Sequence, residues 1–174
     1  MKSNTIEIVT EFDSSGEPSK WETFNTRPSL KLSLVYECVS FLSSSTNITS
    51  TNELNQLLDL VVRIYDEQFT KSTLIDGLPL ENTINYLFEQ VLFVASGKGI
   101  DEKVTNSEAK KQTVNSWEDY KNNLKATIQD MVKEGGQSVN DVLDMPFYFV
   151  FDELNGEAKK KTHKDSMLDA FLIT

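Results

Sequence analysis

Two helical patterns follow each other between Asn52 and Gly97, and they constrain the fold more than any other part of this sequence. In the first pattern, large apolar residues recur at spacings of three and four: Leu54, Leu57, Leu58, Val61, Val62, Ile64, Tyr65 and Phe69. Polar residues fall on the opposite side, which is typical of an amphipathic helix packed on a core. Asn52 is the expected N-cap, because its short side chain can accept from the free N–H groups of a first helical turn.

The segment Thr70–Pro79 joins the two patterns. Gly77 and Pro79 are residues that favour turns, so we expect a short connector with a sharp turn. A positive φ at Gly77 would fit such a turn. A bulkier residue at this position should then destabilise the fold by about 1 kcal/mol or more.

The second pattern, about Leu80–Ala95, is more apolar than the first, and we expect it at the centre of a small helical bundle. Its main stripe consists of Ile84, Leu87, Phe88, Val91, Leu92 and Ala95. Tyr86, Phe93 and Val94 lie outside that stripe. Such residues either extend the core or form a contact surface, so we take these three as candidate partner-binding residues.

The same stretch resembles a known family. The residues Ile64-Tyr65-Asp66-Glu67-Gln68-Phe69-Thr70, followed by Ile75-Asp76-Gly77-Leu78, are similar to tail assembly chaperones of long-tailed (siphovirus-type) phages of Gram-positive bacteria. In that family a helix ends in an aromatic-x-x-Gln-Phe-Thr pattern, and an Asp-Gly-Leu turn opens the next helix. The resemblance is best over Pro28–Gly97. Asp66 stands where a small residue or Gly is common in the family.

The N-terminal residues predict a short strand, because Ile6, Ile8, Thr10 and Phe12 alternate with other side chains. A turn cluster follows at Asp13–Pro18, and Trp21–Phe24 could pair back to complete a hairpin. After Pro28 the apolar spacing favours a helix. Alternating leucines at its start leave a strand open as an alternative, and the family resemblance favours the helix.

The segment Lys98–Asn115 is rich in charged and amide residues and is the best candidate for a linker. Beyond it, Ser116 and Ser138 each precede an Asp by three positions, which is a capping signal for a helix. Gly135-Gly136 should end the first of these helices. We therefore expect a mainly α protein: a helical core module with a short N-terminal hairpin over residues 1–97, a linker over 98–115, and a second helical module over 116–174.

The second module contains the densest aromatic stretch of the chain, Phe147–Phe151, which we expect to be helical. A short helix in a small module cannot bury every side, and aromatic residues are favoured anchors for partners. The further candidate partner-binding residues are accordingly Phe147, Tyr148, Phe149 and Phe151.

The charge balance argues against several classes of partner. The chain has 27 acidic and 17 basic residues and a formal net charge of −10. Nucleic acid and anionic membrane surfaces would repel such a protein. No N-terminal signal pattern and no apolar run long enough for a bilayer is present, so we expect a protein of the host cell cytoplasm.

No motif of catalysis or of cofactor binding stands out. The single histidine, His163, has Asp165 and Asp169 nearby, but these three residues in a chain end do not make a closed metal site. The single cysteine, Cys38, lies in an apolar segment and is expected to be buried. We therefore expect neither an enzyme nor a cofactor or metal protein. A metal-dependent enzyme is one alternative function, and metal analysis of the purified protein would exclude it.

The resemblance implies a function that composition alone does not give. It implies a chaperone that keeps the long helical tape measure protein soluble, recruits the major tail-tube protein, can self-associate and is absent from the mature virion. It also implies a short product extended by a translational frameshift, with Lys110-Lys111 or Lys159–Lys161 as candidate slippery sites. The alternative is a structural subunit of the virion, such as a tail completion or connector protein.

Overall fold

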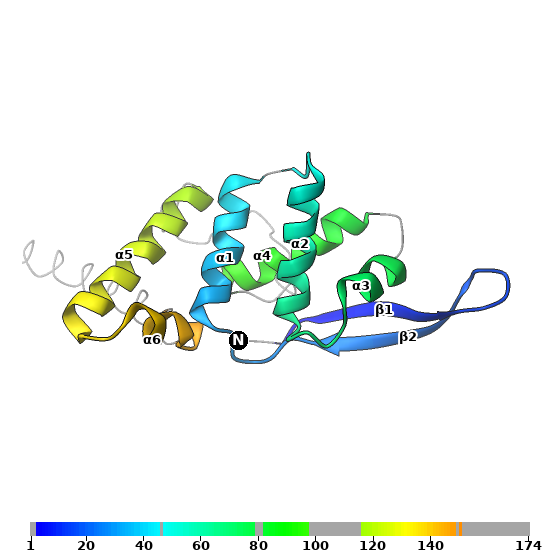
Figure 1. Cartoon of the computed structure of the whole chain (residues 1–174), viewed down its shortest axis with the longest axis horizontal. Coiled ribbons are helices and arrows are strands. Elements are labelled where there is room, and N and C mark those ends of the chain that lie inside the picture. The colour runs from blue at the N-terminus through cyan, green and yellow to red at the C-terminus, as the bar shows by residue number, and fades with distance from the viewer. Residues whose placement is uncertain (1–2, 46, 79–81, 98–115, 149, 151–174) are drawn as a thin grey trace, which may run out of the picture.

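The computed structural model describes residues 3–45, 47–78, 82–97, 116–148 and 150. Over these residues the chain is mainly helical and begins with a two-stranded antiparallel hairpin, which confirms the predicted fold class (Figure 1). The elements in chain order are β1 (Thr5–Phe12), β2 (Pro18–Asn25), α1 (Leu32–Ser44), α2 (Thr51–Ile64), α3 (Lys71–Gly77), α4 (Thr83–Ser96), α5 (Trp117–Gly135) and α6 (Val139–Asp144).

The hairpin is stabilised by the antiparallel pairing of β1 with β2 and by hydrogen bonds in its turn. Ile6 pairs with Phe24 and Ile8 with Glu22, and both isoleucines are fully buried. The Asp13 carboxylate in the turn accepts hydrogen bonds from the N–H groups of Ser15 and Glu17, at 2.8 and 3.0 Å. Bulges near Val9 and Glu11 bend the outer part of the hairpin, which extends beyond α3 at one end of the molecule (Figure 1).

Helices α1, α2 and α4 form the centre of the molecule, because each of them packs against the other two. Their apolar faces supply most of one continuous core, which includes Val35, Cys38, Leu57, Val61 and Val91. Burial of Cys38 is confirmed. Burial also raises the pKa of its thiol, so this cysteine is held in the protonated, unreactive form.

Both ends of α2 differ from the sequence prediction, which placed the N-cap at Asn52 and continued the helical pattern to Phe69. Ser50, not Asn52, is the N-cap: its side chain accepts from Glu53 N–H, and the Glu53 side chain accepts from Ser50 N–H. This reciprocal capping box satisfies two free N–H groups, whereas a cap at Asn52 would satisfy one. At the other end, Asp66 has a φ of 58° and occupies the left-handed position that Gly usually takes after a helix. This geometry explains why Gly suits that position in the family.

The connector between α2 and α4 contains a helix that we did not predict. Thr70 caps α3, because its side chain accepts from Thr73 N–H. Gly77 is the last residue of α3, and it is not among the glycines with positive φ, so the predicted turn conformation is wrong. The reason for a glycine here is contact: a Cβ at position 77 would overlap Ile8 Cγ2 and the Val9 carbonyl oxygen.

The buried face of α4 also differs from the prediction. Phe93 and Val94, placed outside the main stripe, are buried, while Ile84 and Leu92, placed within it, are more than two-fifths exposed. The predicted buried face was wrong because other elements cover α4 on more than one side. It packs against α1 and α2, and its Gln90 reaches Asn4 near the start of the hairpin.

Helices α5 and α6 lie on α1, on the side away from α2 (Figure 1). The predicted caps Ser116 and Ser138 are confirmed, each accepting from the N–H group three residues further on. Gly136, with a φ of 62°, ends α5 as expected. None of the helices in the described part of the chain is both long and apolar enough to cross a membrane.

Candidate partner-binding surface

The residues that carry the family pattern form the junction of four elements. Phe69 is buried against the rings of Phe24 and Tyr65, with centroids 5.0 and 5.5 Å away. Gln68 Nε2 donates to the carbonyl oxygens of Asn25 and Tyr65, at 2.8 and 2.7 Å, and so joins the end of β2 to the end of α2. The pattern is therefore structural: it fixes the hairpin, α2 and α3 relative to each other.

A buried polar network extends this junction to α4. Gln90 is 1% exposed, and its Oε1 accepts from the Tyr65 hydroxyl and from Asn4 Nδ2, both at 2.6 Å. Its Nε2 donates to the Tyr86 carbonyl oxygen at 3.3 Å. Burial raises the pKa of Tyr65, so its hydroxyl keeps the proton that it donates. The helical spacing of α4 did not predict that Gln90 is buried, because it identified this glutamine only as a polar residue.

A groove of about 550 Å³ lies beside this junction, between the hairpin and the first turns of α4. We call it the Trp21–Tyr86 groove; the described residues that line it are Glu7, Trp21, Asn82, Thr83, Asn85, Tyr86 and Glu89. Trp21 is 49% exposed and Tyr86 is partly buried. These residues offer two aromatic rings, two carboxylates and no cationic side chain. Such a lining fits an apolar segment that carries Lys or Arg beside its apolar residues.

A larger groove of about 870 Å³ lies where the chain enters α1 and leaves α2. Most of its charged residues form ion pairs: Arg27 with Asp66, Lys31 with Asp144 at 2.8 Å, and Arg63 with Glu37. A partner bound there would have to compete with these ion pairs. Among the residues that the structure describes, the carboxylates of Glu7 and Glu89 in the Trp21–Tyr86 groove have no ion-pair partner, so this groove is the better candidate for a partner surface.

The structure separates the seven predicted partner-binding residues into three groups. Tyr86 lines the groove, and Tyr148 is 46% exposed. Phe93, Val94 and Phe147 are buried in the core of the chain itself. The remaining two lie outside the described side chains: Phe149 and Phe151. Partner binding by any of the seven stays a prediction, and their burial directs it toward Tyr86 and Tyr148. Sequence reasoning missed Trp21 as a surface residue, because it treated that residue only as part of a strand.

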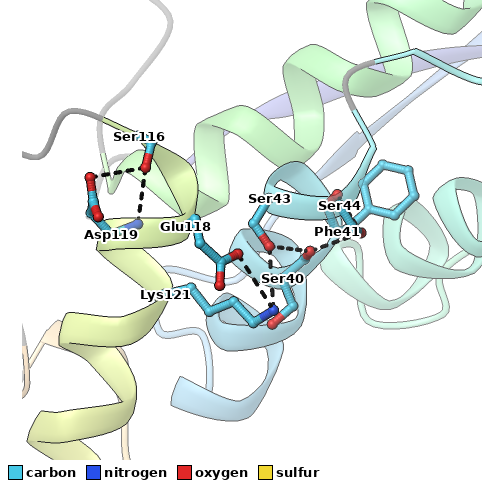
Figure 2. Close-up of polar contacts among 8 residues, drawn as sticks. All are labelled: Ser40, Phe41, Ser43, Ser44, Ser116, Glu118, Asp119 and Lys121. Carbon is cyan, nitrogen blue, oxygen red and sulfur yellow. Dashed lines mark hydrogen bonds and ion pairs between the residues drawn. The ribbon is translucent and has the colours of Figure 1, made fainter.

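The contact between α1 and α5 contains a polar cluster at the end of α1 (Figure 2). Lys121 Nζ donates to Ser43 Oγ at 3.4 Å and lies 4.0 Å from the Glu118 carboxylate. Ser43 Oγ donates to the Ser40 carbonyl oxygen at 2.8 Å. Ser43 thereby satisfies the Ser40 carbonyl group near the end of α1 and gives Lys121 of α5 a polar contact on α1.

The described residues contain no group of three or more His, Cys, Asp or Glu side chains placed to hold a metal ion. His163 and the two aspartates near it lie outside the part of the chain that the structure describes.

Comparison with known proteins identifies the family. The sequence model of a family described as phage tail chaperone protein matches residues 1–112, about two thirds of the chain. No curated protein and no solved structure matches the chain. The match covers the hairpin, α1 to α4 and the pattern residues at their junction. This chain therefore belongs to the phage tail chaperone family.

Proposed function

We propose that this chain binds the tape measure protein during tail assembly, keeps it soluble and acts by covering apolar surface rather than by catalysis. The observation that carries the proposal is the Trp21–Tyr86 groove, in which the exposed Trp21 ring and the partly buried Tyr86 ring share a lining with the carboxylates of Glu7 and Glu89. A helix of the tape measure protein with apolar residues beside Lys or Arg would fit this lining. Burial of apolar area contributes about 25 cal/mol per Å², and the carboxylates would orient the helix.

The net charge of −10 supports the proposal that this chain keeps its partner soluble. Complexes coated with acidic chains repel each other, which opposes aggregation of the partner. The chaperone would act in the host cytoplasm and leave before the virion is complete. The site needs no metal and no cofactor for this role.

Co-expression tests this function. The tape measure protein of the same phage should be largely insoluble when expressed alone and should become soluble, and co-purify, when this chain is expressed with it. A matched control is a similarly acidic, unrelated helical protein, which should not have this effect. A tape measure protein that stays insoluble with this chain would refute the function.

We propose a second partner for the region beyond the family match. By analogy with the family, residues 1–97 would bind the tape measure protein and residues 116–174 would engage the major tail-tube protein. The exposed Tyr148 supports a contact in the second region. Pull-downs with Tyr148→Ala in the full chain should lose the tube protein and keep the tape measure protein. Loss of both partners, or of neither, would contradict this division.

We also propose that residues 1–112 are the shared part of two products related by a translational frameshift. The family match ends one residue after Lys110-Lys111, one of the two expected slippery sites, which supports this site over Lys159–Lys161. Expression from the natural gene should give two products with the same N-terminal peptides. Mass spectrometry that finds one length alone would contradict the proposal.

A further inference from the structure

Helix α4 packs against α1 and α2 (Figure 1), yet a row of large apolar side chains on it stays at least partly exposed. Ile84 and Leu92 are 43% and 44% exposed. Phe88 lies between them and is partly buried, with its ring centroid 5.7 Å from that of Phe41 in α1. Ile84, Phe88 and Leu92, which we call the Ile84–Leu92 row, recur every four positions and therefore form one ridge about 12 Å long.

This row adjoins the Trp21–Tyr86 groove. Asn85 and Glu89 line the groove, and they stand three positions before Phe88 and Leu92, respectively. Side chains three positions apart on a helix are neighbours, with Cβ atoms about 5–6 Å from each other. The side of the groove that Asn85 and Glu89 form is therefore also one edge of the row, so the groove and the row make one continuous surface along α4.

The charge of this surface has one sign. Over Thr83–Ser96, α4 contains no Lys, Arg or His, and Glu89 is its one charged residue. Glu7 adds a second carboxylate to the groove from β1. An apolar ridge with carboxylates along one edge fits a partner that carries cations beside its own apolar residues. A helix suits the ridge in shape, because the ridges of one helix pack into the grooves of another.

We propose that one amphipathic helix of the tape measure protein lies along α4, with its apolar residues on the Ile84–Leu92 row and a Lys or Arg beside Glu89. This inference rests on the proposed function and adds to it how the partner lies and which residues select its sequence. The selected segments are those in which large apolar residues recur at spacings of three and four and are flanked by Lys or Arg. Two to three helical turns of the partner cover a row of about 12 Å.

Titration of full-length variants with the tape measure protein tests the apolar contact. Ile84→Ser and Leu92→Ser should each weaken binding by about fivefold or more, because each removes apolar area that the partner helix buries. Ile75→Ser is the matched control: Ile75 is 57% exposed on α3 and belongs neither to the row nor to the groove. This control should bind like the wild-type chain. Circular dichroism and thermal melts of each variant show whether it is folded.

A charge exchange tests the orientation without changing the row. Overlapping peptides of the tape measure protein, each about 20 residues long and sufficient for a helix of about 30 Å, identify the segment that the wild-type chain binds. Glu89→Lys should weaken binding of that peptide by about tenfold, and replacing one flanking Lys or Arg of the peptide by Glu should restore it. Glu134→Lys makes the same charge change at an exposed residue of α5 and should leave the affinity unchanged.

The outcomes separate this inference from the proposed function. Wild-type affinity in Ile84→Ser, Leu92→Ser and Glu89→Lys would overturn the inference and leave the proposed function standing. A Glu89→Lys defect that no charge exchange in the peptide repairs would also overturn it. If Leu92→Ser abolishes association of the chain with itself and keeps the tape measure affinity, a second copy occupies the row and the inference is wrong. A wild-type chain that does not bind the tape measure protein at all refutes the proposed function, and the inference with it.

Discussion

The Tyr65 hydroxyl donates to Gln90 Oε1 over 2.6 Å and thereby joins the end of α2 to the middle of α4 inside the core. The same oxygen accepts from Asn4, so one buried glutamine connects the start of the chain to both helices. Buried polar groups of this kind fix one arrangement of the elements, because a shifted helix would leave donors without acceptors.

The first prediction concerns alkaline pH. Tyr65→Phe should lower the free energy of unfolding by about 1 kcal/mol at neutral pH, because one buried hydrogen bond is lost. Burial raises the pKa of Tyr65 in the folded chain, while the unfolded phenol ionises near pH 10. The unfolded state therefore loses its proton first, and the stability that Tyr65 contributes falls as the pH rises above about 10. The decline should be shallower in Tyr65→Phe, by up to about 1.4 kcal/mol per pH unit. Urea unfolding across this range measures both slopes, and parallel curves would contradict the assignment.

The second prediction concerns the contact between Gly77 and β1. Gly77→Ala should lower the free energy of unfolding by about 1–3 kcal/mol, because the new Cβ meets Ile8 and the Val9 backbone, and the backbone can move little. Gly135→Ala is the matched control, since a Cβ there meets only ordinary van der Waals contacts with the Gln137 side chain. That change should be neutral or stabilising, by up to about 1 kcal/mol. Thermal melts that rank the two variants in the opposite order would show that the contact is misplaced.

The third prediction concerns the end of α2. Glu67 is exposed and has a φ of 57°, a left-handed conformation that costs an ordinary residue about 1–2 kcal/mol. Glu67→Gly should therefore raise the free energy of unfolding by about 1 kcal/mol. The same substitution at the exposed Glu89, within α4, should lower it by about 1 kcal/mol. An equal loss of stability in both variants would show that Glu67 does not have a left-handed conformation at the end of α2.

The sequence predicted the elements whose signals are local. The caps at Ser116 and Ser138 and the helix end at Gly136 follow from short-range backbone chemistry, and the structure has them in place. The hairpin followed from alternation of apolar residues.

The errors concern interactions between distant residues. Helical spacing places Phe93 outside the stripe, yet α4 is covered from several directions and buries it. Gly77 looked like a turn residue, whereas its role depends on β1, which is far away in the sequence. The Trp21–Tyr86 groove combines β2 with α4, and no pattern within either segment reveals that they share a surface. The two-module division stays a prediction, since α5 and α6 share the core cluster with α1.

The central claim is that the Trp21–Tyr86 groove binds the tape measure protein, and titration of groove variants tests it most directly. Trp21→Ala and Tyr86→Ala should each weaken binding by about tenfold or more in isothermal titration, as expected for aromatic anchors at the centre of an interface. Phe12→Ala is the matched control, because Phe12 is an equally exposed aromatic residue of the hairpin, at 50%, that does not line the groove. It should bind like the wild-type chain. Groove variants with wild-type affinity and unchanged helical circular dichroism would contradict the claim.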